Sequence, residues 1–199
     1  DALPIVLYTD LNEDGLPELI LNARTGSDPS GSVKVFAGRP TGEFKAIPES
    51  PFPGAAADGV RSMDLNQDGR QDLLALFADS AAVLINQGQG RFSQFPTVYS
   101  FGTGFSVGVF ADAFDTNDDG FPDLVFDHGD GNLGVLLNAT DGSFSSMRIS
   151  SPAIIAQRMV RADWNGDGRS DILSVSNLGS LDFLVNQGNG TFGVFPNKL

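Results

Sequence analysis

The sequence contains no cysteine and a single histidine, His128. Disulfide bonds, thiol nucleophiles, iron–sulfur clusters and thiolate zinc sites are therefore excluded. Basic residues are also scarce, because 12 Lys and Arg stand against 25 Asp and Glu, which gives a formal net charge of −13. A chain of this charge is repelled by phosphate backbones and anionic membrane surfaces, so nucleic acid is not an expected partner.

Long apolar runs are missing as well. No segment approaches the roughly 18 apolar residues that a membrane-spanning helix needs, so membrane insertion is not expected. The chain begins at Asp1 without a Met or an apolar signal-like segment, which is typical of a mature chain or of an excised piece. The 41% of hydrophobic residues, with 24 glycines and 11 prolines, indicate a globular chain rich in turns rather than a disordered one.

Most of the acidic residues are aspartates that belong to a repeated word. The sequence has 21 Asp but 4 Glu, and Asp is the short carboxylate that tight turns and hard-cation loops prefer. The nine-residue word D-x-N-x-D-G-x-x-[DE] occurs at residues 10–18, 64–72, 115–123 and 163–171. A second word, Gly-x-Phe, keeps the same spacing and ends at Phe44, Phe92, Phe144 and Phe192. Two words in phase define repeats of about fifty residues, approximately 1–54, 55–101, 102–151 and 152–199.

Each repeat contains short apolar segments that are too short and too irregular for helices, so we predict four strands per repeat. The expected strands are Ile5–Thr9, Leu19–Asn22, Val33–Ala37 and Phe44–Ile47; Val60–Asp64, Leu73–Phe77, Ala82–Asn86 and Phe92–Val98; Val107–Ala111, Leu124–Asp127, Leu133–Asn138 and Phe144–Ile149; and Ile154–Ala162, Ile172–Val175, Leu181–Asn186 and Phe192–Phe195. Four antiparallel strands at this spacing are typical of a β-propeller blade. The sequence thus predicts an all-β propeller of four visible blades, a single propeller or a portion of one, with a β-solenoid or a sandwich as the alternative.

The repeated acidic word has the donor pattern of a calcium loop. Side-chain oxygens at positions 1, 3, 5 and 9, the backbone carbonyl at position 7 and a glycine at position 6 suit a hard cation, whereas zinc or copper would require imidazole or sulfur. The expected ligands are Asp10, Asn12, Asp14, Leu16 and Glu18; Asp64, Asn66, Asp68, Arg70 and Asp72; Asp115, Asn117, Asp119, Phe121 and Asp123; and Asp163, Asn165, Asp167, Arg169 and Asp171.

We interpret these loops as structural sites for up to four Ca²⁺. Each loop collects three ligand carboxylates that repel one another without a cation, so metal should stabilise the fold by linkage. The loop lacks the bidentate Glu at position 12 of an EF-hand, and no helix pair is present to be opened. A calcium sensor is therefore not expected.

These words, together with N-Q-G-x-G-x-F at residues 86–92 and 186–192, resemble the FG-GAP/VCBS repeats of integrin α-subunit heads and fungal propeller lectins. The resemblance spans essentially the whole chain and implies an extracellular Ca²⁺-binding propeller in an adhesion or glycan-binding setting. The chain departs from the family in ending its first loop with Glu18, and in having fewer blades than is common. A closed four-bladed propeller, a portion of a larger one, and an array completed by another copy of the chain all remain open.

Other candidate sites are few. His128 lies in a predicted turn, and no distinctive pairing of carboxylates stands out beyond the metal words, so an enzyme is not expected. Tyr99 begins a stretch predicted to be an irregular connection and is our candidate for ligand contact, whereas Trp164 is predicted to be buried between blades. Two sequons, at Asn138 and Asn189, are candidate glycosylation sites in a secreted eukaryotic protein.

The sequence therefore favours a secreted or cell-surface, calcium-stabilised recognition or adhesion module that binds a glycan or an extracellular protein. The alternative is a structural protein that forms homo-oligomers or filaments through its exposed blade ends. A scaffold domain of a carbohydrate-active enzyme is a further alternative.

Overall fold

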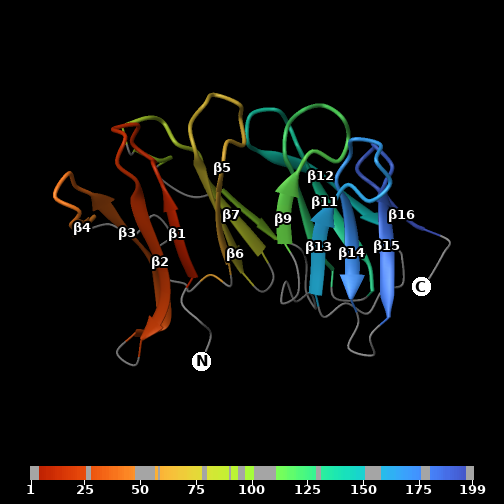
Figure 1. The fold of residues 1–199 in the computed structure, drawn as a ribbon, viewed down its shortest axis with the longest axis horizontal. Helices are drawn as coiled ribbons and strands as arrows, with labels where there is room; N and C mark the ends of the chain where they lie inside the picture. The colour runs from red at the N-terminus through yellow and green to blue at the C-terminus, as the bar shows by residue number, and fades with distance from the viewer. Residues whose placement is uncertain are drawn as a thin grey trace. The chain divides into compact units, whose positions relative to one another are not determined.

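The computed structural model describes residues 5–25, 28–47, 57, 59–77, 80–89, 91–93, 97–100, 111–128, 131–150, 158–175 and 180–195 (Figure 1). These residues form strands, turns and loops, and no helix occurs among them. The described part of the chain accordingly holds no helical segment with the length and apolarity to cross a bilayer.

The strands form four antiparallel sheets, each made of four strands in sequence order. The first sheet contains β1 (Ile5–Thr9), β2 (Glu18–Thr25), β3 (Asp28–Gly38) and β4 (Phe44–Ala46), and the second contains β5 (Gly59–Met63), β6 (Asp72–Phe77), β7 (Ser80–Leu84) and β8 (Thr97–Ser100). The third sheet contains β9 (Ala111–Phe114), β10 (Asp123–Asp127), β11 (Leu133–Asn138) and β12 (Phe144–Ser150), and the fourth contains β13 (Arg158–Ala162), β14 (Asp171–Val175), β15 (Leu181–Asn186) and β16 (Phe192–Val194). The predicted repeat of four strands is confirmed in all four sheets.

Two predicted strands are placed differently by the structure. In the third sheet the first strand is β9, which runs directly into the acidic loop because Phe114 pairs with Asp123; of the predicted strand Val107–Ala111, residues 107–110 lie outside the described residues. In the second sheet Phe92 forms an isolated bridge with Asn86, and β8 begins at Thr97. Pro96, which cannot donate a backbone hydrogen bond, directly precedes that start.

The chain divides into two compact units, residues 1–100 and 101–199, each containing two sheets. In the first unit a core cluster joins the first and second sheets and comprises Leu11, Ile20, Val33, Val35, Ala57, Val60, Leu73, Ala75, Ala82 and Leu84. In the second unit a corresponding cluster joins the third and fourth sheets and comprises Phe114, Val125, Leu133, Val135, Met159, Ile172, Leu184 and Phe192.

The cores explain why one repeat is not a folding unit. A twisted four-stranded sheet exposes an apolar face on either side, and burial of about 25 cal/mol per Å² of apolar surface is gained when a neighbouring sheet covers it. Within each unit this face-to-face packing also brings the two acidic loops to the same edge of their sheets (Figure 1). The packing of neighbouring sheets is thus what positions the candidate site.

Candidate metal loops

The four acidic words form loops of one conformation, each joining the first two strands of its sheet. The position-6 glycines adopt left-handed backbone angles, with φ of 81° at Gly15, 86° at Gly69, 88° at Gly120 and 89° at Gly168. Position 4 is left-handed too, with φ of 64° at Glu13, 58° at Gln67, 63° at Asp118 and 76° at Gly166. Residues with a Cβ rarely adopt this region, so the backbone conformation favours glycine at position 6. At position 4 the rest of the loop holds the backbone in the left-handed region even where the residue is not glycine.

The position-1 aspartate anchors the turn. In the first loop Asp10 accepts hydrogen bonds from the backbone N–H groups of Glu13 and Gly15, at 2.8 and 2.9 Å. In the fourth loop Asp163 does the same for Gly166 and Gly168, at 2.7 and 3.0 Å. The loop backbone therefore wraps around the position-1 carboxylate.

Positions 3 and 5 continue this wrapping. In the second loop Asn66 Oδ1 accepts from the N–H of Asp68 at 3.1 Å, and Asp68 Oδ1 accepts from the N–H of Arg70 at 2.9 Å. Asn66 Nδ2 donates to the other oxygen of Asp68 at 3.1 Å. The third and fourth loops repeat all three contacts, so in each of these loops the side chains at positions 3 and 5 are held by the loop backbone and by each other.

The position-9 carboxylate is a buried hub. Asp72 is fully buried and accepts hydrogen bonds from the N–H of Leu65 at 2.9 Å and of Asn86 at 2.7 Å. It thus joins its own loop to the end of the third strand. Asp123 and Asp171 make the same two types of contact.

Burial raises the pKa of this hub. Desolvation raises the pKa of Asp72 above its ordinary value, although the hydrogen bonds from Asn86 and Leu65 counteract the rise. The neighbouring carboxylates of Asp68 and Asp64 raise it further by repulsion. The pKa of Asp123 is raised in the same way, first by desolvation.

The first loop is built differently around Glu18. One oxygen of Glu18 accepts from the N–H of Leu11 at 2.7 Å, and the other accepts from Asn12 Nδ2 at 3.0 Å. In the other sheets the second contact to the hub comes from the backbone N–H of Asn86, Asn138 or Asn186, and the first sheet has Gly38 at that position. The second oxygen of Glu18 is instead bound by Asn12, within the loop. The longer side chain of Glu18 is therefore matched to a different neighbour, and desolvation raises its pKa as well.

The donor set of each loop fits a hard cation. Positions 1, 3, 5 and 9 offer carboxylate or amide oxygens, Leu16, Arg70, Phe121 and Arg169 offer position-7 carbonyls, and no imidazole or sulfur is present in the loops. Desolvation is the main cause of the raised pKa of Asp72 and Glu18, and the repulsion from neighbouring carboxylates that adds to it is what a divalent cation would relieve. Among the described residues no three carboxylate or imidazole side chains converge on one point. The carboxylates are turned toward the loop N–H groups, so a bound ion would also draw on the amide and backbone oxygens.

Neighbouring loops within each unit are joined by polar contacts. In the first unit Asn86 Nδ2 donates to the Leu11 carbonyl at 2.7 Å. In the second unit the Thr116 carbonyl, which occupies the same loop position as that of Leu11, accepts from the N–H of Gly190 at 2.8 Å. The corresponding Asn186 Nδ2 is buried and has no hydrogen-bond partner among the described residues. In the second unit the Gly190 N–H is therefore the donor to this carbonyl, in place of the asparagine amide.

An ion pair also links the third and fourth loops. Arg169 Nη2 lies 2.6 Å from Asp118 Oδ2, and Arg169 Nε lies 2.9 Å from both oxygens of Asp118. The guanidinium holds the pKa of Asp118 below its ordinary value. In the first unit the residues at these positions are Glu13 and Arg70, but Arg70 instead pairs with Asp68 at 2.6 Å.

The remaining sequence candidates are placed as follows. Tyr99 is half-buried on strand β8, opposite Ala81, so the prediction that it lies in an irregular connection is wrong, and residues 101–105 of that stretch lie outside the described residues. His128 is 5% exposed and lies beside Phe126, with 6.4 Å between ring centroids. It directly follows β10, and residues 129–130 of the predicted turn lie outside the described residues.

The two sequons differ in accessibility. Asn138 is 5% exposed, and its Nδ2, the atom a glycan would modify, donates to the Pro122 carbonyl at 3.0 Å. Asn189 is exposed, and its side chain accepts from Thr191 Oγ1 at 2.6 Å. In this structure the Asn138 side chain is buried and hydrogen-bonded, whereas the Asn189 side chain is exposed and is the accessible candidate.

We expect the folded chain, secreted from a eukaryotic host, to carry a glycan at Asn189 and none at Asn138, because a glycan at Asn138 would replace a buried hydrogen-bond donor. Peptide mass spectrometry would measure occupancy at both positions. Asn189→Gln should remove the glycan without changing the melting temperature, whereas a glycan found on Asn138 would contradict the assignment.

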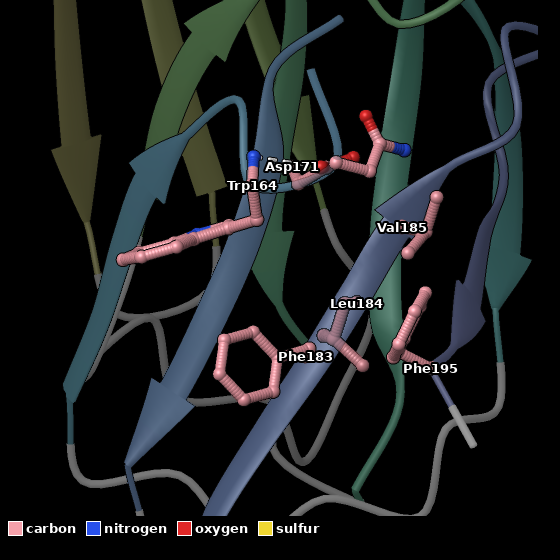
Figure 2. A pocket seen from close by; sticks show the side chains of 7 residues that line it. Trp164, Asp171, Phe183, Leu184, Val185 and Phe195 are labelled. Atoms are coloured by element: carbon pink, nitrogen blue, oxygen red, sulfur yellow. Dashed lines mark hydrogen bonds between the residues drawn. The ribbon is translucent and has the colours of Figure 1, made fainter. Parts of the chain in front are cut away.

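A pocket missed by sequence reasoning lies beside the fourth loop (Figure 2). It measures about 280 Å³ and is lined by Trp164, Asn165, Asp171, Phe183, Leu184, Val185 and Phe195. The Trp164 and Phe183 rings meet edge to face, with 5.7 Å between centroids. Trp164 is 47% exposed, so its predicted burial between blades is wrong for this chain. It occupies the loop position of Leu11, Leu65 and Thr116, which are buried, so its position in the repeat favoured burial and gave no sign of the pocket.

Comparison with solved structures shows a propeller-like fold. A lectin from Agrocybe aegerita, solved to explain specific recognition of non-reducing terminal N-acetylglucosamine, aligns with 96% of this chain and 51% of its own at 23% identity and a TM-score of 0.64. BBS1N in complex with ARL6DN aligns with 100% of this chain and 57% of its own at 14% identity and a TM-score of 0.63. The biofilm matrix protein Bap1 of V. cholerae aligns with 96% of this chain and 30% of its own at 20% identity and a TM-score of 0.54.

This chain thus spans about half the length of the first two proteins and less of Bap1. No curated protein sequence matches it significantly. The profile of the family described as FG-GAP-like repeat matches residues 10–75 and 64–126, which together cover more than half of the sequence and include the first three acidic loops. The chain belongs to the FG-GAP-like repeat family.

Proposed function

We propose that this chain is a calcium-stabilised, non-catalytic recognition module that acts outside the cell, secreted or at the cell surface, and binds glycans. The observation that carries the proposal is the repeated loop, in which an oxygen-only donor set is held by buried hubs such as Asp72 at one edge of each sheet. The architectural similarity to a lectin and to a biofilm matrix protein supports a role in recognition or adhesion.

The role of the metal would be structural. Up to four Ca²⁺ would be held by the loop residues at positions 1, 3, 5, 7 and 9, and each ion would neutralise carboxylates that otherwise repel. Extracellular calcium modules function with dissociation constants of about 10⁻⁴ to 10⁻³ M, which suits an exterior location. The rigid loops would then present a fixed surface to ligand, at little cost in conformational entropy on binding.

Glycan binding is tested with saccharides that end in non-reducing N-acetylglucosamine, because the similar Agrocybe aegerita lectin recognises that group. We expect binding in calcium by glycan array and by calorimetric titration, and loss of binding in chelator. Replacement of the aromatic ring in Tyr99→Ala should weaken binding several-fold, because sugars stack on aromatic platforms. Val98→Ala, which changes a 61% exposed neighbour on the same strand, serves as the matched control.

Two results would count against this function. Absence of binding to any saccharide at high micromolar concentration in calcium would overturn the glycan proposal. Shortened products after incubation with the bound saccharide, detected by mass spectrometry, would overturn the non-catalytic role and favour the scaffold of a carbohydrate-active enzyme.

A further inference from the structure

The second and fourth acidic loops share an arginine beside a candidate ligand. Position 7 is Arg70 in the second loop and Arg169 in the fourth, and position 5 is Asp68 and Asp167 respectively. The position-5 carboxylate and the position-7 carbonyl are both candidate calcium ligands, so each guanidinium starts next to a ligand of its own loop. The contacts that the guanidinium makes therefore affect how easily a cation reaches the position-5 carboxylate.

In the second loop the guanidinium lies directly on the candidate ligand. Arg70 Nη2 is 2.6 Å from Asp68 Oδ2, which also accepts from Asn66 Nδ2 at 3.1 Å. Arg70 Nε donates to the Asn86 carbonyl at 3.2 Å, which holds the side chain over its own loop. A guanidinium on a carboxylate occupies the lone pairs and neutralises the charge that a divalent cation would use. Calcium would bind this oxygen of Asp68 only after displacing Arg70.

In the fourth loop the guanidinium is drawn away from the candidate ligand by the neighbouring loop. Arg169 makes its close contacts with Asp118 of the third loop, through Nη2 at 2.6 Å and through Nε at 2.9 Å. Arg169 Nη1 is 3.6 Å from Asp167 Oδ2, which is too long for a hydrogen bond. Asp167 Oδ2 thus keeps the asparagine contact of its loop, from Asn165 Nδ2 at 3.0 Å, without a close guanidinium contact.

A glycine makes room for the pair of Asp118 and Arg169. A Cβ added at Gly188 would lie 2.7 Å from Arg169 Nε and 2.7 Å from Asp118 Oδ2. At Gly88, the same position of the second repeat, an added Cβ would be 3.8 Å from the nearest atom of the Arg70 side chain. Gly188 lies in the bend that follows β15. The pair in the second unit therefore packs against the backbone of a defined bend.

We propose that Asp118 of the third loop is a positioning residue for calcium in the fourth loop, because it holds the Arg169 guanidinium away from the ligand Asp167. The inference rests on the calcium assignment of the proposed function and deepens it, since it makes one loop depend on its neighbour. Without Asp118, Arg169 would lie on its own position-5 ligand, as the arginine of the second loop does. Calcium would then have to displace the guanidinium in order to bind.

Trp164 allows the fourth loop to be followed separately from the others. It is the single tryptophan of the chain and lies at position 2 of this loop, between the candidate ligands Asp163 and Asn165. Terbium prefers the oxygen ligands that calcium prefers, and energy transfer from a nearby tryptophan excites its luminescence. Titration with Tb³⁺ followed by its displacement with Ca²⁺ would therefore measure the calcium affinity of the fourth loop in the unmodified chain and in each variant.

A double-mutant cycle separates positioning from the simple loss of a charge. Removal of a nearby carboxylate weakens cation binding in any case, and this contribution is the same with or without the guanidinium. Arg169→Gln removes the guanidinium and keeps the position-7 carbonyl. We expect Asp118→Asn to weaken calcium binding about 2- to 5-fold more in the unmodified chain than in the Arg169→Gln chain, in the range of an exposed ion pair.

A matched control and a structural measurement complete the test. Asp141→Asn removes an exposed carboxylate of the same unit outside the acidic loops, and its effect on the affinity should be the same in both backgrounds. A crystal structure of the Asp118→Asn chain grown in chelator should show the Arg169 guanidinium within hydrogen-bond distance of Asp167.

The outcomes distinguish this inference from the calcium assignment itself. Equal losses from Asp118→Asn in the two backgrounds, with calcium still displacing terbium, would overturn the positioning role and leave the calcium assignment intact. Absence of terbium luminescence that calcium displaces in the unmodified chain would overturn calcium binding by the fourth loop, and this inference with it.

Discussion

Removal of calcium is expected to lower the melting temperature of this chain by at least on the order of 10 °C. A site filled at 100 to 1,000 times its dissociation constant adds about 3 to 4 kcal/mol to the free energy of unfolding. In a chain of this size about 1 kcal/mol shifts the melting temperature by about 2 to 4 °C. The loops supply the reason, since carboxylates such as Asp64, Asp68 and Asp72 repel one another within one loop.

Calorimetric melts in calcium, in chelator and in magnesium would measure this shift. Magnesium should give a smaller effect, because it demands a stricter octahedral geometry. Asp68→Ala should reduce the calcium-dependent part of the shift, whereas Asp141→Ala, which removes an exposed carboxylate in a turn outside the acidic loops, should not. Equal melting temperatures in calcium and chelator would contradict the metal assignment.

Asp72→Ala is expected to destabilise the chain even in chelator, by on the order of 2 to 5 kcal/mol. The substitution leaves two buried backbone donors, those of Leu65 and Asn86, without their acceptor, and each such group costs about 1 to 3 kcal/mol. The position-9 carboxylate would thus act as a structural hub independently of any metal. Urea denaturation in chelator would measure the change in the free energy of unfolding.

The control for this hub is the exposed position 5 of the same loop. Asp68→Ala in chelator should leave the free energy of unfolding almost unchanged, because Asp68 is exposed and water can replace its contacts. Asp72→Asn, which keeps one acceptor oxygen, should give an intermediate loss. If Asp72→Ala and Asp68→Ala were equally harmless in chelator, the hub would be refuted.

The acidic words were sufficient to predict the loops and the strands around them. Glycine at position 6 is needed for a left-handed angle, and the structure has φ of 81° to 89° at these four positions. The role of position 9 was only partly anticipated. The sequence presents Asp72 as one more candidate ligand, but its contact with Asn86, fourteen residues later, depends on the pairing of β6 with β7.

Strand boundaries were less predictable where local pattern and pairing disagree. The apolar run from Val107 to Ala111 suggested a strand, of which residues 107–110 lie outside the described residues. The described strand continues three residues beyond the predicted end, to Phe114. The strand reaches Phe114 because Phe114 pairs with Asp123, the last residue of the acidic loop. The same holds for Tyr99, which belongs to β8 through its pairing with Ala81.

The sequence by itself determined the four-strand repeat, the loop conformation and the oxygen donor set, because each depends on residues close together in the chain. Only the tertiary structure decided which side chains are buried, because burial depends on which sheet covers a face. Leu11 and Trp164 occupy the same position in their loops, yet the first is 2% exposed beneath the second sheet and the second is 47% exposed beside an apolar pocket. A short sequence motif determines whether a segment forms a strand or a loop, whereas the packing of a neighbouring sheet determines which side chains are buried.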